Sequence, residues 1–268
     1  MKIEKLLLFK SPKGNVTENE IKEVEDTLAT YGMQSVRYIE GEKQQFDAVI
    51  ALGGDGTMLN ASRIAYQAKK PIMSINFGTL GYMSGLEKGE LGLLSLLKSG
   101  FETEKRMLIS AEVIRNGKTV AECKSLNEVV VTRQADGPIA NVALDCDGAR
   151  VCDYRADGII IATPTGSSAY AMSAGGPIVD TKLEAICVCP ICPHVLATRP
   201  MVFSANSTLE AVNTNNDTEK QNLLISDGRT VCELAYGDIV KVTKSNDSLE
   251  LIKLKKDAFY ETLYKKMS

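Results

Sequence analysis

The chain has 268 residues and a formal net charge of -3, from 31 basic and 34 acidic residues. This length, with 44% hydrophobic residues, allows one large domain or two modest ones. No block of Lys or Arg stands out, which argues against a nucleic acid as the main partner. The apolar run from Leu6 to Phe9 is too short for a signal sequence or a membrane span. We therefore expect a cytoplasmic protein without a membrane partner.

The first hundred residues predict a parallel sheet with helices on its faces. Strands are expected at residues 5–10, 36–39, 47–52 and 72–75, and helices at 18–31, 57–68 and 87–97. Thr17 and Glu20 have the spacing of a capping box before the first helix. The run 47–52 is almost wholly apolar, as in a strand covered on both faces. This regular alternation of strand and helix is typical of α/β domains.

The second half predicts a mostly antiparallel β domain. Asn116-Gly117 and Asp147-Gly148 each lie between two alternating runs, which is a strong hairpin pattern. Strands are expected at residues 109–115, 119–124, 142–146, 150–154, 207–212, 222–225, 230–234, 239–243 and 249–254. A closing helix is expected at 257–266. The predicted domains are therefore 1–105 and 106–255, followed by a C-terminal helical segment at 256–268.

The strongest local motif is Gly53-Gly54-Asp55-Gly56-Thr57, which follows an apolar strand and opens a helix. Strand, glycine turn and helix together aim backbone N–H groups at an anion, and glycine lets a phosphate approach closely. The Asp55 carboxylate would repel phosphate unless it held a metal or accepted a proton from an attacking hydroxyl. The alternative is a tight turn in which Asp55 merely caps the helix.

A second motif runs from Asp157 to Pro177. It contains the apolar strand 159–162, and then Thr163, Thr165, Ser167 and Ser168 on a Pro/Gly loop. Four hydroxyl groups at such a position suit phosphate or sugar oxygens, and the small residues around Tyr170 leave room for a base. The alternative is a loop held by local side-chain-to-backbone hydrogen bonds.

Two further groups of residues carry less information alone. Asn127-Glu128 places an amide beside a carboxylate, which can recognise a vicinal diol or a purine edge. Cys187, Cys189, Cys192 and His194 have residue types that suit zinc. Because Cys187 and Cys189 fall in an apolar strand that ends in a proline-rich turn, we favour reduced core cysteines and expect no zinc.

Taken together, the motifs resemble those of the NAD kinase family. The similarity comprises, in order along the chain, Gly53–Thr57, Gly78-Thr79-Leu80-Gly81, Leu126-Asn127-Glu128, residues 157–177, Pro193-His194 and Arg199-Pro200. The resemblance implies a Rossmann-like α/β domain, a β-rich NAD-binding domain and a final helix that returns to the first domain. It also implies NAD and ATP as substrates, Mg²⁺ as the cofactor, and a homodimer or homotetramer.

The resemblance implies a role for each matching residue. Asp55 is the expected proton acceptor, with Gly56 beside the nicotinamide nucleotide. The expected phosphate and ATP contacts are Gly53, Gly54, Gly56 and Thr57. The expected NAD contacts are Asp55, Gly56, Asn127, Glu128, Arg155, Asp157, Ser168, Ala169, Tyr170 and Ser173, with His194, Asp227 and Arg229 bordering the site. Family members often carry Thr where this chain has Ser168, a change that affects packing more than chemistry.

The implied reaction is attack of the ribose 2′-hydroxyl of NAD on the γ-phosphorus of ATP. Such a transfer requires positioning and charge neutralisation more than covalent help from the protein. Two alternatives share the Gly-Gly-Asp-Gly-Thr turn or its fold, namely a lipid kinase of the diacylglycerol kinase type and a non-catalytic dinucleotide sensor. Phosphofructokinases have a similar turn, but the further signatures of these kinases are missing from the sequence.

Overall fold

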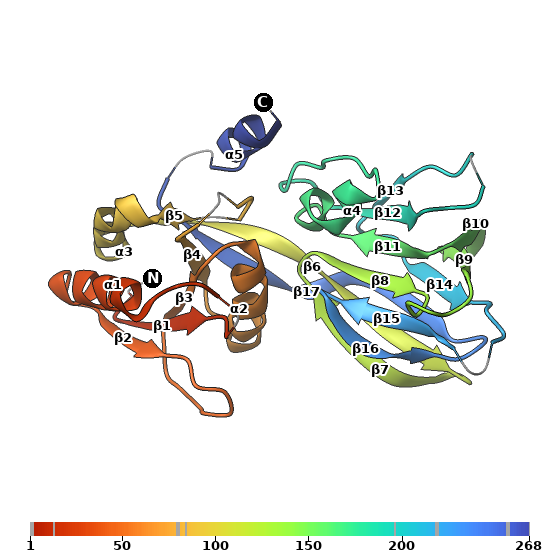
Figure 1. The fold of residues 1–268 in the computed structure, drawn as a ribbon, viewed down its shortest axis with the longest axis horizontal. Coiled ribbons are helices and arrows are strands. Elements are labelled where there is room, and N and C mark those ends of the chain that lie inside the picture. Colours follow the sequence, from red (N-terminus) through yellow and green to blue (C-terminus); the bar gives the residue numbers. More distant parts are fainter. Residues whose placement is uncertain are drawn as a thin grey trace. The chain divides into compact units, whose positions relative to one another are not determined.

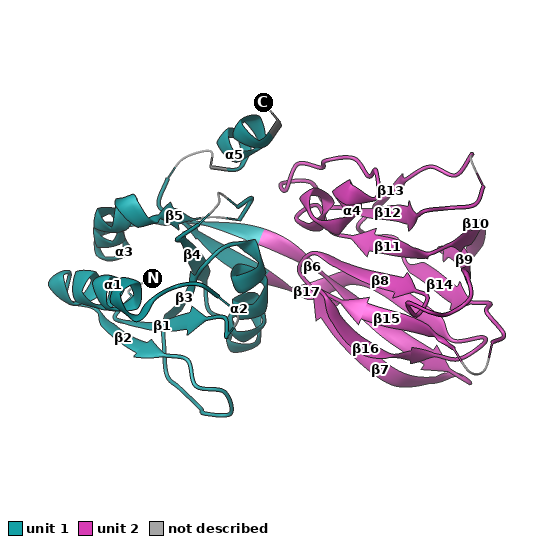
Figure 2. Cartoon of the chain, in the orientation of Figure 1, with its two compact units in different colours: residues 1–105, 249–268 teal, residues 106–248 magenta. Residues whose placement is uncertain are grey.

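The computed structural model of the chain describes residues 3–12, 14–78, 81–83, 85–195, 197–217, 220–255 and 258–267. It divides into two compact units (Figure 2). Unit 1 comprises residues 1–105 and 249–268, and unit 2 comprises residues 106–248. Both boundaries fall inside long strands, β6 (Glu102–Arg115) and β17 (Ile239–Lys253). The sequence analysis placed residues 249–255 in the second domain, whereas here they belong to unit 1.

Unit 1 is a parallel sheet with helices packed on it (Figure 1). Its strands are β1 (Lys5–Lys10), β2 (Gln34–Arg37), β3 (Ala48–Leu52), β4 (Ile72–Asn76) and β5 (Leu86–Glu87). The sheet order is β17, β4, β3, β1 and β2, and β5 also pairs with β4. The helices are α1 (Glu18–Thr30), α2 (Asp55–Ala68) and α3 (Leu96–Ser99). Every residue of β3 and β4 is buried, as expected for strands covered on both faces.

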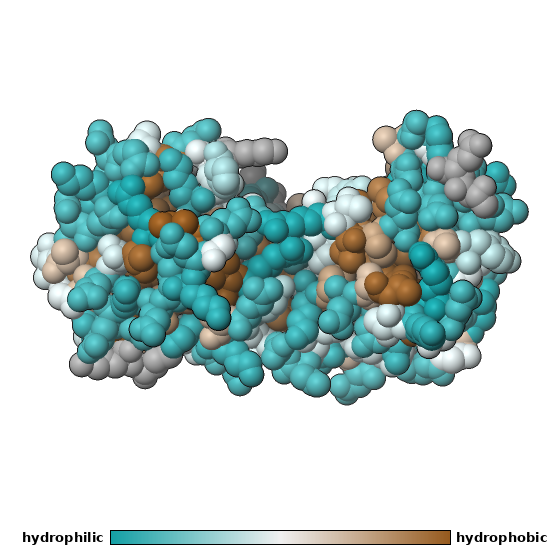
Figure 3. Space-filling view, turned by 90° about the horizontal axis from the view of Figure 1, so that it is seen from below, coloured by the Kyte–Doolittle hydropathy of each residue, from teal (hydrophilic) through white to brown (hydrophobic). Residues whose placement is uncertain are grey.

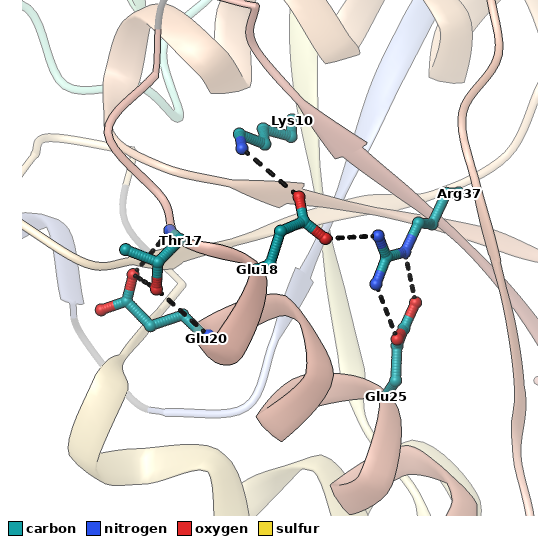
Figure 4. Close-up of polar contacts among 6 residues, drawn as sticks. All are labelled: Lys10, Thr17, Glu18, Glu20, Glu25 and Arg37. Atoms are coloured by element: carbon teal, nitrogen blue, oxygen red, sulfur yellow. Dashed lines mark hydrogen bonds and ion pairs between the residues drawn. The ribbon is translucent and has the colours of Figure 1, made fainter.

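The start of α1 confirms the predicted capping box, and ion pairs hold the helix beside the sheet edge (Figure 4). The Glu20 N–H donates to Thr17 Oγ1 at 3.3 Å, and the Thr17 N–H donates to Glu20 Oε2 at 2.9 Å. Arg37 of β2 donates to Glu25 through two nitrogens, at 2.7 and 3.0 Å, and to Glu18 at 2.7 Å. One guanidinium therefore joins two turns of α1 to the edge strand.

Two expectations for regular elements were wrong. The helix expected at 87–97 is a 3₁₀ segment, Lys88–Ser95, followed by the short α3. Gly89 and Gly92 lower the helix propensity of this segment. The separate strands expected at 239–243 and 249–254 are one strand, β17. Strand β17 continues through its polar middle because it pairs with both β14 and β6, and Lys244 and Asp247 add ion pairs with Glu184 and Lys124.

Unit 2 contains two antiparallel sheets. One has the order β13, β12, β11, β8, β15 and β16, and the other joins β10, β9, β14, β17, β6 and β7. The remaining strands are β7 (Lys118–Ser125), β8 (Glu128–Thr132), β9 (Ala140–Cys146), β10 (Ala149–Ala156), β11 (Gly158–Ala162), β12 (Ala185–Ile191), β13 (Met201–Ser204), β14 (Leu209–Asn213), β15 (Asn222–Ser226) and β16 (Arg229–Leu234). Strand β13 was not predicted.

Two-residue turns connect three of the hairpins. Asn116-Gly117 and Asp147-Gly148 both have positive φ at each residue, which confirms the predicted turns. Asp227-Gly228, between β15 and β16, has the same conformation, with φ of 47° and 75°. This third turn brings an acidic side chain to the end of β15.

The core of unit 2 lies between its two sheets. Val129, Val131, Ile159 and Ile161 face one apolar cluster together with residues of the second sheet, such as Leu209. Alternate residues of the same strands face a second cluster that includes Ala171 of α4 (Tyr170–Ser173). The segment after β11 therefore covers the outer face of the six-stranded sheet, which fixes the loop that carries the second motif.

The last helix, α5 (Ala258–Met267), belongs to unit 1. The ammonium of Lys266 lies 4.3 Å from the centre of the Tyr82 ring, and Lys255 pairs with Glu90 at 2.6 Å. Asp257, the expected first residue of this helix, lies outside the described residues. Among the described helices, none has the length and apolar character needed to cross a membrane. The face shown in Figure 3 is mostly hydrophilic, with apolar side chains in limited patches.

An ion pair in unit 2 whose carboxylate is buried gives a stability prediction. Arg115 donates to both Asp238 oxygens, at 2.9 and 2.6 Å, and the Ala235 N–H donates to Asp238 Oδ2 at 2.8 Å. The Asp238 side chain is 1% exposed. Asp238→Ala should lower the free energy of unfolding by about 1–3 kcal/mol, because the Ala235 N–H loses its acceptor, whereas the Arg115 guanidinium still meets water and the Glu233 carbonyl. Urea denaturation measures the change.

The matched control is Asp136→Ala, which removes the carboxylate of the Lys220 ion pair at the surface. The Asp136 side chain is 76% exposed, so its loss should change stability far less. Equal losses of unfolding free energy in the two variants would show that the Arg115–Asp238 pair stabilises the protein no more than a surface ion pair does.

Candidate functional site

The glycine turn of unit 1 is built from the end of β3 and the start of α2. Gly53 has φ of 142°, and a Cβ atom there would lie 2.5 Å from Thr57 Oγ1, so both conformation and space require glycine. The Gly53 N–H donates to the Ile75 carbonyl at 2.9 Å, which ties the turn to β4. Gly54 is the N-cap of α2, and Gly56 in its first turn is exposed. The turn thus presents Asp55 and Gly56 at a helix N-terminus.

The Asp55 carboxylate is held by a second segment of unit 1. The Tyr82 N–H donates to Asp55 Oδ2 at 2.8 Å, and the Met83 N–H donates to Oδ1 at 3.0 Å. A Cβ atom on Gly81 would overlap Asp55 Oδ1, so only glycine fits there. The side chain makes no capping bond in its own helix, so the helix-cap alternative is wrong. Of the Gly78–Gly81 motif, Thr79 and Leu80 lie outside the described residues.

Asn76 is a site neighbour that the sequence analysis missed. It is the last residue of β4 and only 4% exposed. Its amide donates to the Gly78 carbonyl at 3.1 Å and accepts from the Gly78 N–H at 3.2 Å. A Cβ atom on Gly54 would lie 3.8 Å from Asn76 Oδ1. The sequence could have indicated Asn76, because it is a polar residue at the carboxyl end of a buried parallel strand, and ligands bind at that edge of the sheet.

In unit 2, one end of the six-stranded sheet brings together three predicted segments. Glu128 pairs with Ala162 and Val129 pairs with Ser226, so β8 starts where β11 and β15 end. The Thr163 N–H donates to the Asn127 carbonyl at 2.8 Å. The 126–128 segment, the loop after β11 and the Asp227 turn therefore lie side by side.

Asn127 and Glu128 are buried with unused hydrogen-bonding atoms. Each is 7% exposed, and among the described residues neither Asn127 Oδ1 nor Glu128 Oε2 has a hydrogen-bond partner. Burial, followed by the nearby charge of Asp227, raises the pKa of Glu128 to about 8. Buried polar atoms without partners are uncommon, and here they mark a place where a ligand can bind.

The loop after β11 uses its hydroxyl groups largely within the protein. Thr163 Oγ1 donates to the Leu126 carbonyl, Ser167 Oγ to the Pro164 carbonyl and Ser168 Oγ to the Thr165 carbonyl. The local side-chain-to-backbone alternative thus describes Ser167 and Ser168, whereas Thr163 donates to a residue 37 positions away. Beyond them, Ala169 is partly buried, Tyr170 is 46% exposed and Ser173 is exposed. The accessible part of the motif is therefore 169–173.

Asp157 lies at the opposite end of β11 from Thr163, and the five-residue strand between them spans roughly 13 Å. Arg133, which the sequence analysis missed, donates through Nε to Asp157 Oδ1 at 2.6 Å. Arg155 is exposed, and its carbonyl accepts the His194 N–H at 2.9 Å. The predicted NAD contacts thus form two groups within unit 2. Arg229, the first residue of β16, is exposed beside the Asp227 turn.

The cysteine cluster is divided between the core and the surface. Cys187 and Cys189 are fully buried in the apolar cluster around Ile160, and burial raises the pKa of their thiols to about 11 and 12. Cys192 is exposed, in a turn with positive φ. Within the described ranges, no group of three or more His, Cys, Asp or Glu side chains could hold a metal ion. The two buried thiols therefore pack as core side chains.

Comparisons with known proteins place both units in one family. The family model for the ATP-NAD kinase N-terminal domain matches residues 6–93, and that for the ATP-NAD kinase C-terminal domain matches residues 126–254. An NAD kinase of Caldanaerobacter subterraneus is 39% identical over 225 residues, covering 83% of this chain and 78% of the relative. An NAD kinase of Ectopseudomonas mendocina is 39% identical over 247 residues, covering 91% and 83%.

Solved structures agree with this result. A crystal structure of an NAD kinase from Archaeoglobus fulgidus in complex with ATP has a TM-score of 0.78 and 26% identity, and the match covers 98% of each chain. A yeast NADH kinase complexed with NADH has the same fold, with a TM-score of 0.88 at 20% identity and coverage of 99% and 88%. The chain therefore belongs to the ATP-NAD kinase family, and it is an enzyme that phosphorylates NAD with ATP.

Proposed function

We propose that Asp55 accepts the proton of the adenosine ribose 2′-hydroxyl of NAD as that oxygen attacks the γ-phosphorus of ATP, giving NADP, and that this takes place in the cytoplasm. The observation that carries the proposal is the Asp55 carboxylate at the start of α2, held by the N–H groups of Tyr82 and Met83. Within the described residues this carboxylate accepts only from outside its own helix and forms no ion pair, so it can serve as a base. Its fixed orientation suits a reaction that depends on positioning.

The glycine turn supplies the phosphate contacts in this proposal. The N–H groups of Gly53 and Thr57 already donate to the Ile75 and Gly54 carbonyls, so the phosphate contacts of the turn come from the Gly54 and Gly56 N–H groups at the N-terminus of α2. A Cβ atom on Gly56 would meet nothing within 4 Å. An Mg²⁺ ion would be carried by the ATP phosphates, since such ions need only one or two protein carboxylates besides the substrate. Asp55 would be the carboxylate of the turn available to it. When bound, the ion neutralises phosphate charge.

NAD recognition is assigned to unit 2. Asn127 and Glu128 contact the ribose and base through their unpartnered buried oxygens. Ser168, Ala169, Tyr170 and Ser173 line the adenosine pocket. Arg155 and Asp157, with His194 nearby, contact the other end of the dinucleotide, and Arg229 borders the site. We also propose that the chain forms a homodimer or homotetramer, as the family resemblance implies.

The central test is Asp55→Asn. Single-turnover NADP formation should fall about 10²- to 10⁴-fold, because the amide cannot accept the proton. The affinity for NAD, measured by calorimetry on the same preparation, should stay within about threefold, since removing a negative charge beside phosphates does not oppose an anionic ligand. If affinity and rate fell together, Asp55 would be a substrate-positioning residue. If the rate hardly changed, the proton would leave by another route.

Gly81→Ala tests whether the fixed position of the Asp55 carboxylate matters for the rate. The new methyl overlaps Asp55 Oδ1, so it must displace the carboxylate or the 81–83 backbone. A displacement of about 1 Å is enough for a single-turnover rate loss on the order of 10²-fold. The control is Gly89→Ala, where a Cβ atom would meet nothing within 4 Å and which should keep its activity. Full activity of Gly81→Ala would mean that the position of Asp55 is not critical.

Activity should depend on a divalent cation. The phosphates of ATP and the Asp55 carboxylate otherwise concentrate negative charge in one place. Excess EDTA should abolish NADP formation, and Mg²⁺ added beyond the chelator should restore it. Turnover that persisted in EDTA would contradict the assigned cofactor.

A further inference from the structure

Two acidic side chains are buried beside each other in unit 2, although only one of them has hydrogen-bond donors. Glu128 and Asp227 are each 7% exposed, and the Asp227 N–H donates to the Glu128 carbonyl at 3.1 Å. Two adjacent negative charges are costly in a place with little water. The hydrogen bonds around each group indicate which one carries the charge.

The Asp227 carboxylate accepts three consecutive backbone N–H groups. Leu126 donates to Oδ2 at 2.8 Å, and Asn127 and Glu128 donate to Oδ1 at 2.9 and 3.2 Å. Donation by several N–H groups stabilises a carboxylate in its charged form. These bonds also fix the backbone from which the Asn127 and Glu128 side chains project.

Glu128 has the opposite environment. Its Oε2 has no hydrogen-bond partner among the described residues. Its paired neighbour on β11 is Ala162, and the residue at the end of β15 is Ser226, both uncharged. Asp227 is the charged group that acts on it, and burial together with that charge raises the pKa of Glu128 to about 8. At neutral pH, Glu128 therefore keeps its proton while Asp227 is ionised.

We propose that Asp227 is a positioning residue of the NAD site, which fixes the 126–128 backbone and presents the Asn127 amide and a protonated Glu128 carboxyl to the ligand. A protonated carboxyl has one O–H donor and one carbonyl acceptor. With Asn127 it offers donors and acceptors to the hydroxyls or ring edge of a nucleoside, without a second negative charge beside Asp227. The identity of the ligand rests on the proposed function, whereas the protonation of Glu128 does not.

The chain contains a matched control for Asp227. Asp147 occupies the same position in the Asp147-Gly148 turn, with φ of 50°, and its carboxylate accepts the Thr208 N–H at 2.8 Å. It lies in the β9–β10 hairpin and not beside Glu128. Asp147→Asn therefore reports what the loss of a turn carboxylate does by itself.

The first experiment is an NMR titration of side-chain carboxyl groups in protein labelled with ¹³C-glutamate, with Glu128 identified by its absence in Glu128→Gln. Glu128 should titrate near pH 8 in the unaltered chain and in Asp147→Asn. In Asp227→Asn, loss of the adjacent charge should lower the midpoint by about half a pH unit or more. A Glu128 midpoint in the ordinary carboxyl range, or one that does not move in Asp227→Asn, would overturn the proposal.

The second experiment separates positioning from general damage. Asp227→Asn loses the charge and one of the acceptor oxygens, so the KM for NAD should rise about tenfold or more while the KM for ATP stays unchanged. Asp147→Asn should change neither value. Equal effects of the two variants would refute the positioning role. If Asp227→Asn does not fold, Asp227→Ser keeps an acceptor without charge and takes its place.

The two experiments also distinguish this inference from the proposed function. If the unaltered chain produced no NADP, the proposed function would fail, yet the titration would still decide the charge states of Glu128 and Asp227. If the chain produced NADP but Glu128 titrated as an ordinary carboxyl, only the inference about Asp227 would fail.

Discussion

A carboxylate beside the backbone N–H groups of a glycine turn needs its orientation controlled, and the rest of this site depends on that constraint. The N–H groups of Tyr82 and Met83 supply the control by donating to the two oxygens of Asp55. Their approach requires the absence of a side chain at Gly81. The glycine turn and residues 81–83 are thus two parts of one structure, and each has glycine for a different reason.

Unit 2 holds its acidic residues by comparable means. Asp227 accepts three backbone N–H groups, and Asp157 is held by the Arg133 guanidinium instead. Glu128 has no such partner on Oε2. A carboxyl group that the protein leaves unsatisfied is the one best suited to meet a ligand, because binding then supplies a hydrogen bond that folding did not. In the proposed site, Asp227 fixes the backbone, whereas Glu128 keeps an oxygen for the ligand.

The sequence predicted features that depend on residues close together in the chain. The capping box at Thr17, the turns at Asn116 and Asp147, and the strand–turn–helix around Asp55 all follow from local patterns. The bonds from Tyr82 to Asp55 and from Leu126 to Asp227 join residues separated by 27 and 101 positions, and no local pattern indicates them. Strand β17 was divided in the prediction at its polar middle, whereas its pairing with β14 and β6, which are distant in the sequence, keeps it in the sheet.

The same distinction explains why the glycine turn alone did not identify the substrate. Lipid kinases of the diacylglycerol kinase type share that turn, since any kinase must bring phosphates and a proton acceptor together. What distinguishes an acceptor substrate is the group that carries the attacking hydroxyl. In this chain the buried amide and carboxyl of Asn127 and Glu128 suit the polar surface of a nucleoside, whereas a lipid requires apolar contacts. We therefore propose that specificity for NAD depends on the 126–128 segment and the residues that fix it, and that the chemistry depends on the turn that holds Asp55.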